Sequence, residues 1–125
     1  ASLTISSKNY SSWALRGWLL CKLAGLDFHE DIKTLDDPST RAELLHLSPS
    51  FLVPKLTIGD AEAWGSWAIA EMLHEIHPES GLLPENAKAR AHCRSICGEM
   101  LSGFANVRAA LPMNLKVSDM IAEIN

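Results

Sequence analysis

The sequence lacks the features that mark nucleic-acid-binding, membrane-spanning or disulfide-rich secreted proteins. Its formal net charge is −4, so it has no excess of basic residues for a phosphate backbone. No apolar run reaches the roughly 18 residues that a membrane helix needs. The three cysteines show no framework spacing, and the first ten residues have no charged segment followed by an apolar one. We therefore expect a reduced, cytoplasmic protein without nucleic-acid or membrane partners.

Two motifs of redox and metal enzymes are also missing. Without a C-x-x-C pair, a thiol–disulfide or peroxide-reducing enzyme is disfavoured. The segment His74–His77 does not have the H-E-x-x-H spacing of a zinc helix. Cys93 and Cys97 lie one helical turn apart but have no well-placed further ligands, so they are expected to be buried helix cysteines. Cys21 is expected to be inert in an apolar helix, and no metal is expected.

What is present is a globular composition and an alternation of short strands and helices. Hydrophobic residues make up 47% of the 125 residues and charged residues 21%, which fits one domain, or a small domain and part of another. Strands are predicted at Leu3–Ser6 and Phe28–Lys33. A hairpin with a Gly59-Asp60 turn is predicted within residues 53–64. Residues 36–49 are predicted to contain a short helix bounded by prolines.

Three further helices follow from apolar periodicity and capping residues. Ser11 or Ser12 caps a helix that ends near Ala24, before Gly25. Ser66 is the expected N-cap of a helix with an apolar stripe formed by Ile69, Met72, Leu73 and Ile76. After a linker at residues 77–87, one long helix is predicted from about Asn86 to Leu111. Its expected buried face comprises Cys93, Cys97, Met100, Phe104, Val107 and Leu111, and Pro112 ends it.

This order predicts a mixed sheet with helices on both faces. The first helix is apolar nearly all round, so it should be covered on two sides, and one small sheet covers only one. The segment after Ser118 begins like another helix. We therefore expect further helices after Asn125.

Four segments, in order, resemble the glutathione transferase family. "SSWALRGWLLCKLAGLDF" resembles the serine-bearing opening of the zeta class, and "SPSFLVPKL" resembles the segment around the family's cis-proline. "WGSWAIAEMLHEIHP" resembles the segment that holds the γ-glutamyl end of glutathione. "GLLPENAKARA" resembles the linker into the family's helical domain. The resemblance extends to about Lys116.

The resemblance implies an α/β fold: a thioredoxin-like mixed four-stranded sheet in the order βαβαββα, followed by the beginning of an all-α domain. The implied division is a glutathione-binding domain at residues 1–77, a linker at 78–85 and an incomplete helical domain at 86–125. It also implies a cis Val53–Pro54 bond, glutathione as co-substrate, a small electrophile as second substrate, and a homodimer.

The resemblance further implies the site residues. Ser11, with Ser12 as the alternative, would donate a hydrogen bond to the glutathione sulfur. The glutathione-binding set comprises Ser11, Ser12, Leu52, Val53, Pro54, Gly65 and Ser66. From spacing alone Ser11 and Ser12 are better explained as helix caps, and Ser66 can also be a cap only. One serine can cap while the other faces the ligand.

Two positions depart from the family pattern. Leu52 stands where relatives usually carry Arg, Lys or Gln, and Gly65 stands where they carry Asp, Glu or Gln. Each missing charge-assisted contact weakens glutathione binding by about 1.5–3 kcal/mol, unless Lys8, Arg41 or Lys55 substitutes. Two hypotheses remain: a glutathione transferase that conjugates or isomerises a small electrophile, with maleyl-type substrates as one option, and a transferase-like binding or scaffold protein with weak or no catalysis.

Overall fold

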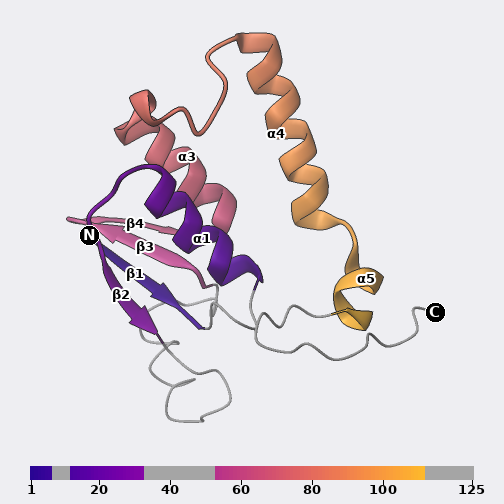
Figure 1. Ribbon diagram of the computed structural model, residues 1–125, viewed down its shortest axis with the longest axis horizontal. Coiled ribbons are helices and arrows are strands. Elements are labelled where there is room, and N and C mark those ends of the chain that lie inside the picture. The colour runs from indigo at the N-terminus through magenta and orange to yellow at the C-terminus, as the bar shows by residue number, and fades with distance from the viewer. Residues whose placement is uncertain (7–11, 33–52, 112–125) are drawn as a thin grey trace.

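The computed structural model describes residues 1–6, 12–32 and 53–111, and its sheet has four strands (Figure 1). These strands are β1 (Ser2–Ile5), β2 (His29–Ile32), β3 (Lys55–Ile58) and β4 (Ala61–Trp64). Their spatial order is β2-β1-β3-β4. β1 pairs in parallel with β2, whereas the β1–β3 and β3–β4 pairs are antiparallel. The predicted thioredoxin-like mixed sheet is confirmed.

Helix α1 (Ser12–Leu23) ends as the sequence predicts. Gly25 adopts a positive φ of 71°, which glycine reaches without steric cost. The Gly25 N–H donates to the Lys22 carbonyl (3.1 Å), and the Leu26 N–H donates to the Cys21 carbonyl (3.0 Å). These two bonds form a Schellman motif, so the chain leaves the helix at once and turns toward β2.

The predicted hairpin is present, and its second strand, β4, leads into α3 (Ser66–Ile76). Ile58 pairs with Ala61, so the loop has two residues, and Gly59 takes the positive φ (59°) that a two-residue hairpin turn requires. The prediction that Ser66 caps α3 is wrong, because the cap residue is Gly65 (φ 89°, ψ 144°) and Ser66 is the first helical residue. Gly65 holds the cap position because the sharp bend after β4 needs a positive φ.

The core lies between one face of the sheet and the paired helices α1 and α3, which pack side by side in Figure 1. Its fully buried members are Leu3, Ile5, Ala14, Cys21, Leu56, Ile69 and Leu73. Ile69 and Leu73 belong to the predicted stripe of α3, while Ile76 at its end is 43% exposed. Both helices cover the same face. The helix predicted within residues 36–49, on which a second covered face depends, lies outside the described residues.

The predicted long helix is divided in two. After the short 3₁₀ turn Pro78–Ser80, α4 (Ala87–Ser102) begins with Asn86 as its cap, whose Oδ1 accepts from the Ala89 N–H (3.0 Å). α4 ends at Gly103, which is extended, and Phe104 follows with φ 67° before α5 (Ala105–Ala110). The backbone of Gly103 and Phe104 is not helical, so the apolar periodicity does not continue as one helix.

The buried face predicted for this long helix is also wrong for the described part of the chain. α4 has no fully buried residue, and Met100, Phe104 and Val107 are 44%, 57% and 47% exposed. Only one side of α4 faces the rest of the described structure. That side bounds a pocket with α1 and α3.

Candidate functional site

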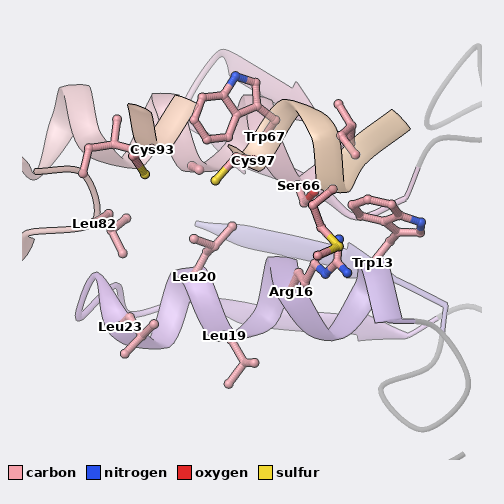
Figure 2. A pocket seen from close by; sticks show the side chains of 14 residues that line it. Trp13, Arg16, Leu19, Leu20, Leu23, Ser66, Trp67, Leu82, Cys93 and Cys97 are labelled. Carbon is pink, nitrogen blue, oxygen red and sulfur yellow. The ribbon is translucent and has the colours of Figure 1, made fainter. Parts of the chain in front are cut away.

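A pocket of about 470 Å³ separates α1 and α3 from α4 (Figure 2). Its lining comes from four parts of the chain: Trp13, Arg16, Leu19, Leu20 and Leu23 of α1, Ser66, Trp67 and Ala70 of α3, Leu82 and Leu83 of the connecting segment, and Cys93, Cys97, Met100 and Leu101 of α4. Most of these side chains are apolar. The second side of α1, which the sequence predicts to be covered, therefore faces this pocket. Leu19 and Leu23 on that side remain 43% and 69% exposed.

Four of the predicted site residues come together at one end of the sheet. The Gly65 N–H donates to the Pro54 carbonyl at 2.8 Å, which ties the start of α3 to the start of β3. Ser66, only 8% exposed, lines the pocket. Val53 is half-buried before Pro54, and the bond between them is cis, as predicted.

The remaining predicted site residues are placed incompletely or not at all. Ser12 is the first residue of α1, which is consistent with a serine at the head of that helix. Ser11 and Leu52 lie outside the described residues, as do Lys8 and Arg41. Lys55, the third candidate substitute for the missing cation, is 5% exposed, and its Nζ lies 3.4 Å from Glu62 Oε1.

Arg16 is a pocket residue that the sequence analysis did not single out. Its guanidinium lies 4.1 Å from the centre of the Trp13 ring, a cation–π contact that holds both side chains on the pocket wall. The signal in the sequence was the single basic residue in the first two turns of an otherwise apolar helix. A cation beside an apolar pocket allows an anionic group to be bound there.

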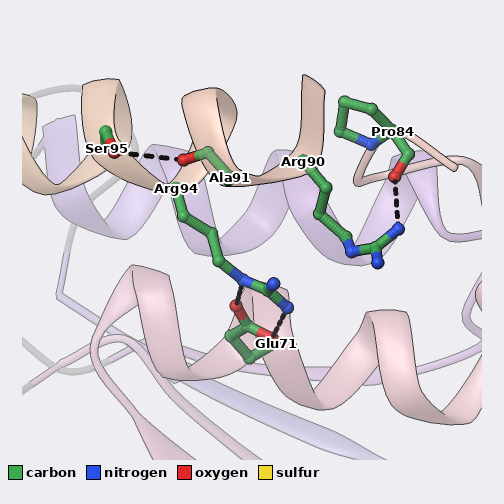
Figure 3. A network of polar contacts seen from close by, with 6 residues as sticks. All are labelled: Glu71, Pro84, Arg90, Ala91, Arg94 and Ser95. Atoms are coloured by element: carbon green, nitrogen blue, oxygen red, sulfur yellow. Dashed lines mark hydrogen bonds and ion pairs between the residues drawn. The ribbon is translucent and has the colours of Figure 1, made fainter. Parts of the chain in front are cut away.

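An ion pair fixes α4 against α3 on the outer side of the pocket (Figure 3). Arg94 Nε and Nη2 donate to the two carboxylate oxygens of Glu71, at 2.8 and 3.3 Å. The neighbouring Arg90 donates from Nη1 to the carbonyls of Pro84 (3.2 Å) and Glu85 (2.7 Å). These contacts set the position of α4 and thus the width of the pocket.

Replacing Glu71 with Gln should weaken this contact by about 0.2–1 kcal/mol, since the pair is partly exposed to solvent. The hydrogen bond from Arg94 lowers the pKa of Glu71 below its usual range. A carboxyl whose folded-state pKa is depressed contributes stability above its unfolded pKa of about 4.3 and loses it as pH falls through the folded value.

Urea unfolding at several pH values tests this expectation. The stability difference between wild type and Glu71→Gln should be present at neutral pH and shrink as pH falls below about 4. Glu75→Gln removes the same charge from an exposed position of α3 and is the matched control. An equal, pH-independent loss in both variants would show that the Glu71–Arg94 pair contributes nothing.

The three cysteines lie in different environments. Cys21 is fully buried in the core, and burial raises the pKa of its thiol to about 11, in agreement with the predicted inert cysteine. Cys93 and Cys97 are only half-buried and line the pocket, so the prediction that they are buried is wrong. All three thiols are free.

Neither a metal site nor a membrane helix is found where the structure is described. Among residues 1–6, 12–32 and 53–111, no three His, Cys, Asp or Glu side chains are grouped so that they could hold a metal ion. Within the same ranges, no helix has the length and apolar character to cross a bilayer.

Comparisons with known proteins agree with this geometry. A probable maleylacetoacetate isomerase of Caenorhabditis elegans is 29% identical over 110 residues, which are 88% of this chain and 48% of the relative. The chain thus spans about half the length of that curated relative.

Two solved structures are similar in fold and sequence. A maleylacetoacetate isomerase from Methylobacterium extorquens, with bound malonate and glutathione, has a TM-score of 0.71 and 27% identity, covering 89% of this chain and 54% of that one. A glutathione transferase homologue from Burkholderia, with bound glutathione, has a TM-score of 0.72 and 26% identity, covering 87% and 57%.

The family assignment rests on a match that covers more than half of the chain. The family model of the glutathione S-transferase N-terminal domain matches residues 10–76, from the head of α1 through β3 and β4 to the end of α3. The same range contains Val53, Pro54, Gly65 and Ser66. The chain therefore belongs to the glutathione S-transferase N-terminal domain family.

Proposed function

We propose that this chain is the glutathione-binding part of a glutathione transferase that conjugates or isomerises a small electrophile. The carrying observation is that the first turns of α1 and α3 open on one pocket, where Trp13 and Ser66 both line the wall. A helix N-terminus carries unpaired N–H groups and a partial positive charge, which favour an anion. Two such ends on one pocket suit a thiolate and a carboxylate of the same ligand.

Three parts of glutathione have a proposed contact: the thiol, the γ-glutamyl carboxylate and the peptide backbone. Ser11 at the head of α1, with Ser12 as the alternative, donates to the thiol sulfur and favours its ionised form. Ser66 and the N–H groups of the first turn of α3 take the γ-glutamyl carboxylate. The backbone of Val53, at the head of β3, pairs with the peptide backbone of glutathione as an added strand would.

The glycyl carboxylate is the least well supported end of the ligand. Leu52, at the position expected to contact this carboxylate, supplies no charge, and Lys55 is already paired with Glu62 (3.4 Å). Gly65, at the position expected to contact the amino group of glutathione, supplies no charge either. We therefore expect glutathione to bind more weakly than to a fully charged site. Each lost contact lowers the affinity by about tenfold to a hundredfold.

The pocket supports a small, partly apolar electrophile that carries an anionic group. Its walls are mostly apolar, and Arg16 provides a guanidinium beside them. A maleyl-type acid has both an electrophilic double bond and carboxylates, so isomerisation of such a substrate is our specific proposal. The maleylacetoacetate isomerases among the similar proteins support it.

The organisation of the whole protein is proposed on the same basis. We place the glutathione-binding domain at residues 1–77, the linker at 78–85, and the start of a helical domain at 86–125. A homodimer is the proposed assembly, because Ile96, Leu101 and Phe104 leave apolar surface exposed on α4 and beyond. A cytoplasmic location agrees with three free thiols.

Calorimetric titration of glutathione, paired with a conjugation assay, separates this proposal from its rival, a transferase-like binding or scaffold protein with weak or no catalysis. We expect saturable binding at or below about millimolar glutathione, and Ser66→Ala should weaken it about tenfold through loss of a hydroxyl hydrogen bond to a charged group. The control is Ser80→Ala, because the Ser80 hydroxyl donates to the His77 carbonyl (2.7 Å) outside the pocket. No binding at millimolar concentration would favour the scaffold protein, for which Leu52 and Gly65 argue.

A further inference from the structure

Cys93 and Cys97 form a pair of thiols on the pocket wall that the glutathione site does not use. They lie one turn apart on α4, and Figure 2 shows both side chains pointing from that helix toward α1. Both are half-buried and line the same pocket. Two thiols on adjacent turns of one helix face can act together on one ligand.

Arg16, on α1, lines the same pocket as Cys97. Burial is the main influence that raises the pKa of Cys97, the neighbouring Cys93 acts in the same direction, and the charge of Arg16 opposes them. Cys97 therefore keeps its proton until a ligand replaces it.

The helical spacing disfavours a direct disulfide between the two cysteines. Side chains four residues apart on a helix have Cβ atoms about 5–6 Å apart. A disulfide needs about 3.5–4.5 Å between its Cβ atoms, so α4 would have to distort. The spacing suits one inserted atom that bonds to both sulfurs and leaves the helix intact.

We propose that Cys93 and Cys97 form a chelating site for monoorganic arsenic(III) compounds, RAs(OH)₂, whose substituent R occupies the apolar pocket. Two S–H and two As–O bonds break, two As–S bonds form, and two water molecules leave. Arsenic stays trivalent and no oxidant or reductant is needed. This ligand requires only two sulfur donors because carbon fills its third position, unlike a metal ion held by three or more side chains.

The pocket supplies the second half of the recognition. Leu20 of α1, Trp67 of α3 and Leu82 of the connecting segment lie around the cysteines in Figure 2, and all three line the cavity. Burying an aromatic substituent among them gains affinity by removing apolar surface from water. The site goes beyond the proposed glutathione chemistry and does not depend on it.

Titration of the reduced chain with phenylarsenic(III) oxide, in the absence of glutathione, tests the proposal. Intact mass should show one phenylarsenic group per chain with two protein hydrogens lost, and Trp fluorescence should change because Trp67 lines the pocket. A simple dithiol added afterwards should reverse both signals. Methylarsenic(III), which has a smaller substituent, should bind about tenfold more weakly.

Cysteine variants test whether Cys93 and Cys97 are the residues that bind arsenic. Cys93→Ser and Cys97→Ser should each weaken binding about a hundredfold, because one remaining thiol loses the chelate advantage. Cys21→Ala is the control and should bind as wild type does, since Cys21 is fully buried. Circular dichroism checks that every variant is folded. Unchanged binding in either serine variant, or equal affinity for the phenyl and methyl compounds, would overturn the proposal.

Discussion

Ser11→Ala is expected to lower the rate of glutathione addition to a small electrophile by roughly tenfold to a hundredfold near neutral pH. A free thiol has a pKa of about 8.5, so most of it is protonated at neutral pH. Lowering that pKa by about two units takes roughly 2.7 kcal/mol of preference for the thiolate. A hydrogen bond to a charged partner supplies about 1.5–3 kcal/mol. The N-terminus of α1 adds about 0.3–1 kcal/mol to the preference for the thiolate.

The pH–rate profile is the measurement that isolates this role. Removing the hydroxyl should move the rising limb of the profile to higher pH by about one to two units, because the helix end alone remains. The rate at high pH should change little, since the thiol is then ionised without help. Ultraviolet absorbance of the bound thiolate should follow the same shift.

Ser12→Ala and Ser66→Ala are the matched variants. Ser66→Ala should raise KM without moving the pH profile, because its proposed partner is a carboxylate and not the sulfur. Ser12→Ala should leave the profile in place if Ser11 is the donor. A shifted profile in Ser12→Ala, with Ser11→Ala unchanged, would transfer the thiol contact to Ser12.

The strands and the first helix were predictable from sequence because local signals and tertiary packing agree there. Local sequence favours one backbone conformation at the Gly59-Asp60 turn, in its two flanking strands and at the helix end before Gly25. β1, β3, β4 and α1 are accordingly found within one or two residues of their predicted bounds. The cis form of the Val53–Pro54 bond was predicted from the family resemblance, because residue preference alone favours trans.

The failures share a different cause, which is backbone geometry imposed from outside the local pattern. Ser66 has the better capping side chain, yet Gly65 occupies the cap because its N–H must reach the Pro54 carbonyl while its φ is 89°. Apolar periodicity continues from Cys97 to Val107, yet the backbone leaves the helix at Gly103. Periodicity reports which side chains share a face and not whether the backbone remains helical.

The pocket itself could be predicted only in part. An all-round apolar α1 indicates a second contact surface, but no local signal shows that Cys93 and Cys97 reach across to it from a helix about 80 residues later. That arrangement depends on the Glu71–Arg94 ion pair and on Arg90 holding the connecting segment. Such long-range polar contacts have no periodic signature in the sequence.

Gly17→Ala is expected to destabilise the chain by about 1–3 kcal/mol, although alanine is the better helix former. A Cβ at Gly17 would lie 2.6 Å from both Cβ and Cγ of Pro54 and 3.7 Å from Ile69 Cδ1. The proline ring is rigid and fully buried, so it cannot move aside as a flexible side chain would. α1 would therefore have to shift away from the start of β3.

This contact also matters for the proposed site, because it sets the distance between the head of α1 and the Pro54–Gly65 pair. Thermal unfolding measures the stability loss, and glutathione titration should show weaker binding in the same variant. Gly98→Ala is the matched control: Gly98 lies inside α4, and a Cβ added there would meet no atom within 4 Å, so the same substitution should stabilise by about 0.5–1 kcal/mol. If Gly17→Ala were as stable as Gly98→Ala, α1 would not rest on Pro54, and the proposed geometry of the glutathione site would fail with it.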